Sequence, residues 1–126
     1  MKESFLERAK ENLSAAELLF DNGMFNASAN RAYYAAFHAA IAALFTIGIK
    51  PQIEHRTIQS LFSDNFFNRR KVFPSEYKKY LLDMQNIRSV ADYKVGINKK
   101  ISKEQLKNAK KFLELILGEI NYENKS

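Results

Sequence analysis

The segment IRSVADY, residues 87–93, places a cation, an acid and a phenol close together. Arg88 and Asp92 are four residues apart, so on a helix they share a face and can form an ion pair. Tyr93 falls about 140° from Arg88 around an ideal helix. The guanidinium can bind a phosphate, and the phenol can donate a hydrogen bond or stack on a nucleobase. The alternative is an exposed ion pair that stabilises the helix by only about 0.3–0.5 kcal/mol.

A second polar group lies in NRAYYAAFHAA, residues 30–40, a segment that is otherwise mostly alanine and aromatic. At about 100° per residue, Arg31, Tyr34 and His38 share one stripe of a helix that is apolar nearly all round. Such a helix is central, and a buried arginine without a partner costs several kcal/mol. Arg31 therefore needs an acid, for which Asp92 is a candidate, or an exit to solvent. Two interpretations stay open: a satisfied polar pair inside the bundle or at an oligomer interface, and a functional pocket.

The other candidates are His55, in PQIEHRT, and a row of lysines near the C-terminus. A lone histidine near a helix N-terminus is more often a neutral hydrogen-bonding group than a catalyst. Lys103, Lys107 and Lys110 share a helical stripe that is either a solvated face or a set of phosphate contacts. With two histidines and no cysteine we expect no metal site. Since no glycine-rich phosphate loop is present, we expect no cofactor either.

The composition is that of a basic globular domain. The chain has 126 residues and a net charge of +6, with an isoelectric point of about 9.5. This length favours a single domain, which we place at residues 1–120 with a flexible tail at residues 121–126. The charge permits contact with nucleic acid or another acidic partner. The absence of cysteine fits a cytoplasmic protein, and the longest apolar stretch, residues 32–49, is too interrupted for a membrane span.

Helices must position these residues, because no segment alternates as a strand would. The first helix starts at a capping-box pattern at Ser4 and ends at Gly23. The second runs from about residue 25 and ends at Gly48. The third covers roughly residues 54–68, and the fourth opens at Pro74 and fades near Gly96.

The fifth helix has the clearest predicted start. Ser102 and Gln105 have the spacing of a capping box, and Ile101 and Leu106 stand where a hydrophobic staple would hold the entering chain. With short connections between the segments, the predicted fold class is all-α: a single-domain, up-and-down bundle of about five helices.

The order and spacing of four segments resemble a known family. NRAYYAAFHAAIAAL, GIKPQIEHRTIQSLF, IRSVADY and the C-terminal helix around KKFLELI together resemble the small stand-alone HEPN proteins of prokaryotes, over about residues 5–120. The resemblance implies a helical bundle that forms a homodimer, and often a minimal nucleotidyltransferase as partner in a toxin–antitoxin-like pair. Active members of the family look like metal-independent ribonucleases, in which an arginine is followed after four to six residues by a histidine.

The resemblance places that arginine at Arg88 and fills the histidine position with Tyr93, preceded by Asp92. A phenol with a pKa near 10 is a poor general base at neutral pH. We therefore expect a module that homodimerises and binds nucleotide, RNA or a nucleotidyltransferase, in a toxin–antitoxin-like or stress and defence system. Arg31 and His38 could line the same cleft as Arg88. The alternatives are an active metal-independent ribonuclease toxin, with His38 or His55 in the vacant role, and a purely structural interaction domain.

Overall fold

The computed structural model describes residues 2–69, 72–93 and 96–125, with the side chains of residues 93 and 122–125 left aside, and it holds no strand within these ranges. The α-helices are α1 (Lys2–Asp21), α2 (Phe25–Thr46), α3 (His55–Ser63), α4 (Tyr80–Tyr93) and α5 (Lys99–Lys125). A π-helical turn, η1 (Asp64–Arg69), and a 3-10 turn, η2 (Ser75–Tyr77), lie between α3 and α4. The predicted all-α bundle is confirmed.

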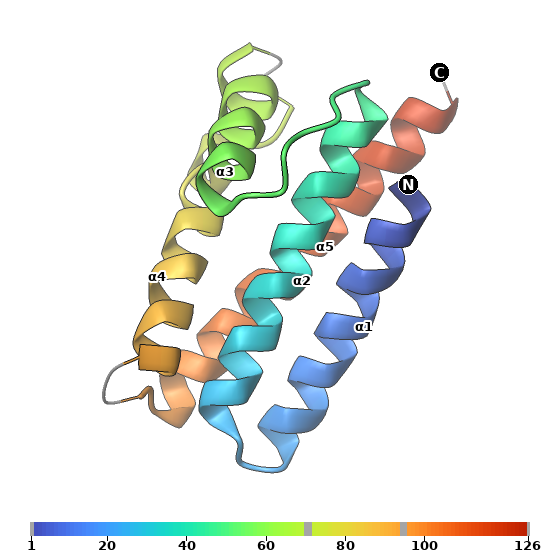
Figure 1. Ribbon diagram of the computed structural model, residues 1–126. Helices are drawn as coiled ribbons and strands as arrows, with labels where there is room; N and C mark the ends of the chain where they lie inside the picture. The colour runs from blue at the N-terminus through green and yellow to red at the C-terminus, as the bar shows by residue number, and fades with distance from the viewer. Residues whose placement is uncertain (1, 70–71, 94–95, 126) are drawn as a thin grey trace.

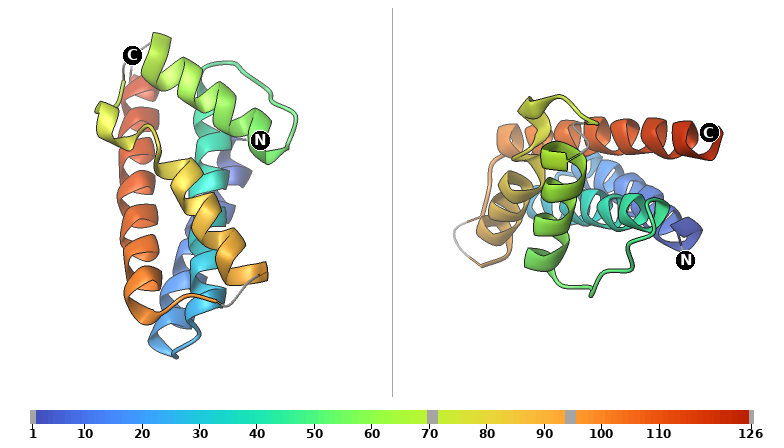
Figure 2. Two further views of the ribbon diagram at one scale, coloured as in Figure 1. Left: turned by 90° about the vertical axis from the view of Figure 1, so that its left-hand side faces the viewer. Right: turned by 90° about the horizontal axis from the view of Figure 1, so that it is seen from above.

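Four helices run alternately down and up, and α3 lies across one end of them (Figure 1). Helix α2 stands in the centre, with α1 and α4 on its two sides and α5 behind it in the view of Figure 1. Figure 2 shows α3 crossing above α4 at the end of the bundle where both chain termini lie. Because α2 packs against the other four α-helices, it is the element that can bring their side chains together.

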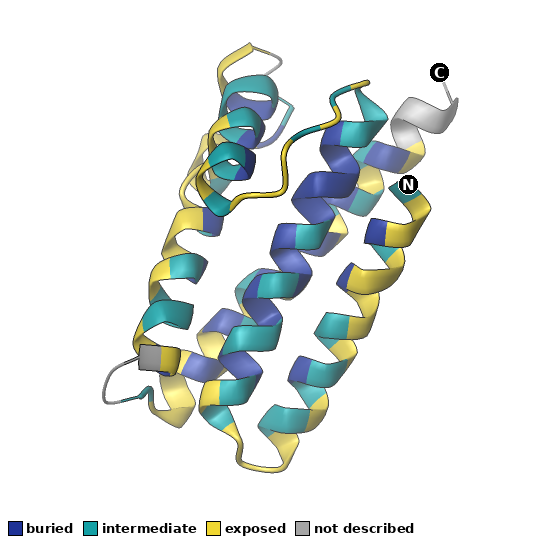
Figure 3. Ribbon diagram, in the orientation of Figure 1, coloured by how far each residue is buried: buried dark blue, intermediate teal, exposed yellow. Residues whose placement is uncertain are grey.

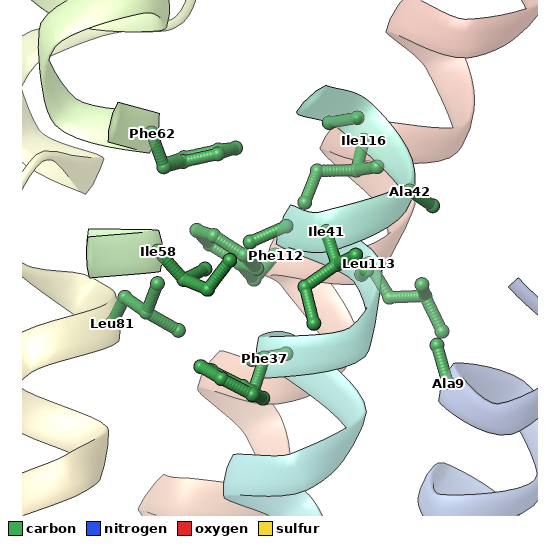
Figure 4. Packing of buried hydrophobic residues seen from close by; sticks show 14 of the residues in the cluster. Ala9, Phe37, Ile41, Ala42, Ile58, Phe62, Leu81, Phe112, Leu113 and Ile116 are labelled. Atoms are coloured by element: carbon green, nitrogen blue, oxygen red, sulfur yellow. The ribbon is translucent and has the colours of Figure 1, made fainter. Parts of the chain in front are cut away.

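Helix α2 is central because alanine dominates it. Thirteen of its 22 residues are buried, eight of them alanines, and these small side chains let the neighbouring helices approach closely. The larger side chains fill the remaining space: Phe37 and Ile41 of α2 meet Ile58, Phe112 and Ile116 from α3 and α5 (Figure 4). Figure 3 shows that part of α2 nevertheless remains accessible. That accessible stripe includes Arg31, Tyr34 and His38, as the helical spacing predicted.

Two glycines end the first two helices, as the sequence indicated. Gly23 and Gly48 have φ angles of 76° and 83°, a left-handed conformation that side chains with a Cβ rarely adopt. In each case the residue after the glycine donates its backbone N–H to a carbonyl one turn back, Met24 to Leu19 at 2.9 Å and Ile49 to Leu44 at 2.9 Å. This pattern closes the helix and satisfies carbonyls that would otherwise lack a donor.

The predicted start of the fifth helix is wrong. Helix α5 begins at Lys99, and the side chain of Asn98 caps it by accepting a hydrogen bond from the N–H of Ile101 at 2.9 Å. Ser102 and Gln105 lie inside the helix and are fully buried, while Ile101 is exposed and makes no staple. Ser102 connects two helices instead of capping one. The Ser102 hydroxyl donates to the carbonyl of Phe25 at 3.0 Å, which ties α5 to the start of α2.

Other helix boundaries also differ from the predicted ones. Helix α1 already includes Lys2, so Ser4 is not its cap. The third helix stops at Ser63 and widens into η1, a turn that buries the adjacent rings of Phe66 and Phe67 together. The fourth begins as the separate turn η2 before α4. Helix α5 runs to Lys125, beyond residue 120, because no proline or left-handed glycine interrupts it in the described range.

Candidate functional site

The Arg88–Asp92 pair predicted from the spacing is present on α4. Arg88 Nε lies 3.0 Å from Asp92 Oδ2, and the two side chains are 14% and 23% exposed. Helix α4 is held in this orientation by Leu81 and Met84, which are buried in the core. The pair is therefore neither a fully solvated surface contact nor a buried one, which was the question left open by the sequence.

Asn30 connects this pair to Arg31, and Asn12 connects Arg31 to His38. Asn30 Nδ2 donates to Asp92 Oδ2 at 2.9 Å, and Asn30 Oδ1 accepts from Nε and Nη2 of Arg31 at 2.9 and 2.6 Å. Asn12 of α1 accepts from Arg31 Nη1 at 3.1 Å, and its Nδ2 lies 3.2 Å from His38 Nδ1. The network thus runs from α1 through α2 to α4. Asp92 reaches Arg31 only through an amide, so the expected direct acid partner is replaced by two neutral ones.

The ring of Tyr34 brings the two arginines together. The guanidinium carbon of Arg31 lies 5.1 Å from the ring centroid and that of Arg88 lies 5.4 Å from it. These are cation–π distances. Arg31 and Arg88, far apart in the sequence and on different helices, therefore share one aromatic ring on the accessible stripe of α2. We call Arg31, Tyr34, Arg88, Asp92 and Asn30 the arginine cluster.

Two histidines lie next to the arginine cluster. The His55 ring has its centroid 5.9 Å from that of Tyr34, and its Nδ1 is hydrogen-bonded to Tyr33 Oη at 2.7 Å. The His38 ring lies 6.1 Å from Tyr34 on the other helical turn. The helical spacing placed His38 on one stripe with Tyr34, and the bundle brings His55 of α3 beside the same tyrosine.

The surroundings of these rings favour their neutral forms. Burial lowers the pKa of His38, and the nearby charge of Arg8 lowers it further. Burial also lowers the pKa of His55, with a smaller effect from Arg88. Burial raises the pKa of Tyr33 to about 12. Both histidines are therefore uncharged at neutral pH, so the positive charge of this region belongs to the arginines.

The remaining candidates are Tyr93 and the three lysines of α5. Tyr93 is the last residue of α4, and its side chain lies outside the described residues. Lys103, Lys107 and Lys110 are exposed and line a groove of about 430 Å³ between α5 and α1, where Lys110 approaches Glu17 at 3.5 Å. Because this face also carries acids of α1, it is less basic than its sequence suggested. It is separate from the arginine cluster, which lies on α2 and α4.

Comparison with known proteins assigns the chain to a family. Its sequence matches the HEPN domain family over residues 2–121. The chain belongs to the HEPN family. The match covers all five helices except the last residues of α5, so the arginine cluster lies within the matched region.

Several relatives of this HEPN domain are curated proteins. A protein of Methanocaldococcus jannaschii named "Putative toxin MJ0605" is 36% identical over 72% of this chain and 66% of its own length. The "UPF0332 protein glr0978" of Gloeobacter violaceus is 32% identical over 73% of this chain and 71% of its own length. A second Methanocaldococcus jannaschii protein, "Putative toxin MJ0142", is 29% identical over 82% of this chain. The matches thus span about two thirds of these relatives.

Two kinds of feature are missing from the part of the HEPN domain that the structure describes. None of the helices there is both long enough and apolar enough to pass through a bilayer. Within the same residues, no three side chains of His, Asp or Glu come together in a way that could hold a metal ion.

Proposed function

We propose that this HEPN domain is an RNA-binding module of a toxin–antitoxin-like system, that it acts as a homodimer in the cytoplasm, and that it cleaves RNA poorly. The observation that carries the proposal is the shared position of Arg31 and Arg88 around Tyr34. Two guanidiniums held beside one ring can bind a phosphodiester by charge-assisted hydrogen bonds. The names of two relatives support a toxin-like role.

The charge balance of the arginine cluster supports anion binding. Asn12 and Asn30 accept from three of the five N–H donors of Arg31 without adding negative charge. Asp92 accepts from Asn30 and Arg88, and it is connected to Arg31 through Asn30. Because the acceptors of Arg31 are neutral amides, the charge of Arg31 can attract a phosphate. The same anion could belong to a free nucleotide, so a single-stranded RNA and a mononucleotide are the two ligands to compare.

Poor cleavage follows from the groups that could act as a base. Metal-independent cleavage needs a base for the 2′-hydroxyl and a cation for the charge that develops on the phosphate. Arg88 can supply the cation. Tyr93 stands in the expected histidine position, and with an ordinary pKa near 10 only about one phenol in a thousand is ionised at pH 7. Loss of general-base help typically costs about 10²–10⁴-fold in rate.

The test is RNA binding by single variants with a matched control. Arg88→Ala and Arg31→Ala should each weaken binding of a short single-stranded RNA about tenfold or more at low salt, and lower the slope of log affinity against log salt by about 0.7. Arg69→Ala is the control, because Arg69 is 72% exposed and pairs with Asp64 on η1, away from the cluster. Equal losses in all three variants would mean that binding is general charge attraction and would contradict the proposal.

A second function, that of an active ribonuclease, is favoured by one specific contact. His55 and Arg88 both lie against Tyr34, so a neutral imidazole and a cation stand around the same ring. The test is cleavage of labelled RNA at neutral pH with a metal chelator present. We expect little or no cleavage. Efficient cleavage that is lost in Arg88→Ala would establish the ribonuclease instead, and His55→Ala and His38→Ala would then identify the base.

A further inference from the structure

A second groove, with a different lining, lies between α3 and the start of α4. It encloses about 430 Å³. In the left view of Figure 2 these two elements face the viewer, with α3 above α4. The groove is lined by side chains of α3, of the turn after η2 and of the first turn of α4: Arg56, Gln59, Ser60, Phe62, Ser63, Lys78, Lys79, Leu81 and Leu82. None of these belongs to the arginine cluster.

The groove combines an apolar floor with a cationic rim. Phe62 and Leu81 are almost fully buried beneath it, whereas Leu82 is 49% exposed. Arg56 from one side and Lys78 and Lys79 from the other carry the positive charge, and no carboxylate is among the lining residues. An exposed leucine between cations is complementary to a ligand that carries an apolar group flanked by negative charges.

Glu54, the acid closest in sequence to Arg56, is already engaged. Glu54 caps α3, where its carboxylate accepts from the N–H of Arg56 at 3.2 Å and from the Thr57 hydroxyl at 2.6 Å. The helix cap thus holds this carboxylate at the end of α3, outside the set of groove-lining residues. On the opposite rim, Lys78 Nζ donates to Asn68 Oδ1 at 2.9 Å, a neutral partner that leaves its charge uncancelled.

We infer that this groove docks an acidic peptide segment of a partner protein, with one bulky apolar side chain set on Leu82 and its flanking carboxylates on Arg56, Lys78 and Lys79. A volume of about 430 Å³ is at the small end for binding pockets, which run from about 300 to 1,000 Å³. It suits one or two anchoring side chains rather than a folded surface. An RNA strand is a poorer fit, because base-stacking sites present exposed aromatic rings and the one ring here, Phe62, is only 3% exposed.

This inference extends the proposed function, since a toxin-like module is controlled by a protein partner, but it rests on different residues. The probe is a short fluorescein-labelled peptide of Glu, Asp and Leu, measured by fluorescence polarisation near physiological salt. One control peptide has serine in place of leucine, and the other has lysine in place of the acids. We expect the unmodified domain to bind the first peptide and neither control, because both the apolar anchor and the charges are required.

The decisive experiment compares two double variants that change the charge by the same amount, one at the groove and one on α5. Arg56→Glu with Lys79→Glu should weaken peptide binding about tenfold or more. Both glutamates would stand in or just before the first turn of a helix, where negative charge is favourable, so the fold should tolerate them. The matched control is Lys103→Glu with Lys107→Glu, which alters exposed lysines of α5 by the same charge. It should bind within about twofold of the unmodified domain.

Two further variants separate the alternatives. Leu82→Asn changes a half-exposed side chain without disturbing the core and should also weaken binding several-fold. Arg88→Ala should lose RNA and keep the peptide, so a failure of the proposed RNA site would not affect this test. The inference is overturned if the unmodified domain does not bind the peptide, if both double variants lose it equally, or if single-stranded RNA displaces it from the groove.

Discussion

Under the proposed function, Asp92 stabilises the fold but competes with RNA for Arg88, so Asp92→Asn should lower the stability and raise the RNA affinity. Its Oδ2 atom accepts from Arg88 Nε at 3.0 Å and from Asn30 Nδ2 at 2.9 Å. An asparagine has nearly the same shape and keeps an acceptor, but it removes the negative charge. The folded state loses two charge-assisted hydrogen bonds, and Arg88 becomes free of the carboxylate that competes with phosphate for its guanidinium.

The size of the stability change follows from the partial exposure of the pair. Removing one partner of a buried ion pair costs about 3 kcal/mol or more, whereas an exposed pair contributes less than about 1 kcal/mol. Side-chain exposures of 14% and 23% place this pair between these limits. We expect Asp92→Ala to lower the free energy of unfolding by about 2 kcal/mol. For Asp92→Asn we expect about 1 kcal/mol, because hydrogen bonds to a neutral acceptor are roughly half as strong.

Two measurements on the same samples test this prediction. Urea unfolding gives the stability change, and salt-dependent binding of a short single-stranded RNA gives the affinity, which should rise about three- to tenfold for Asp92→Asn at low salt. Asp83→Asn is the control, because Asp83 is exposed on the same helix and is not part of the arginine cluster. It should change stability by less than about 0.5 kcal/mol. A fall in RNA affinity for Asp92→Asn would show that Asp92 orients Arg88 for binding, and would refute the competition argued here.

Three further predictions concern pH, backbone and assembly. Folding lowers the pKa of both His38 and His55, so the unfolded chain binds protons more readily than the folded one. The two histidines should therefore not reduce the free energy of unfolding above about pH 6.5. That free energy should fall as the pH drops through this value and on through the lowered folded-state pKa values. Urea midpoints between about pH 7.5 and 5 measure this fall, and a His38→Gln, His55→Gln double variant should show a flatter profile. Gly23→Ala should lower the free energy of unfolding by about 1 kcal/mol, because Gly23 has φ of 76°. Gly118→Ala should raise it by about 0.5–1 kcal/mol, because Gly118 lies inside α5 with open space around its Cβ position. Thermal melts that shift in the same direction for both variants would contradict these backbone roles of the two glycines. With ten phenylalanines and six tyrosines in a small bundle, we expect a homodimer that buries at least about 1,000 Å², and light scattering at micromolar concentration that finds only a 14.6 kDa particle would count against it.

Interactions within one helix could be predicted from the sequence because spacing alone determines them. Arg88 and Asp92 are on one face of any helix that contains them, and the structure has that ion pair. Gly23 and Gly48 end their helices because few other residues adopt the required φ angle. The capping box at Ser102 failed for the converse reason. Its pattern is local, but the burial of Ser102 and Gln105 against α2 and α4 is tertiary, and the helix could extend past it as soon as Asn98 provided another cap.

Contacts between helices could not be predicted, because they depend on how each helix is rotated about its axis. One residue of error in register turns a side chain by about 100°, which would carry Asn30 away from Asp92. Two asparagines in the sequence nevertheless indicated a contact of this kind. Asn12 and Asn30 lie in helix interiors, where asparagine is a poor helix former, and a polar amide in an alanine-rich helix needs a partner. Both amides proved to hold Arg31.

The use of amides in place of acids determines what the arginine cluster can do. Had Asp92 met Arg31 directly, as the sequence suggested, its carboxylate would have compensated the charge of Arg31. Asn30 instead transmits a hydrogen bond from Arg31 to Asp92 without adding charge, so Arg31 itself donates to neutral amides. The two asparagines thus occupy three of the five N–H donors of Arg31 while leaving its charge uncompensated, and a phosphate is a ligand that this charge can still attract.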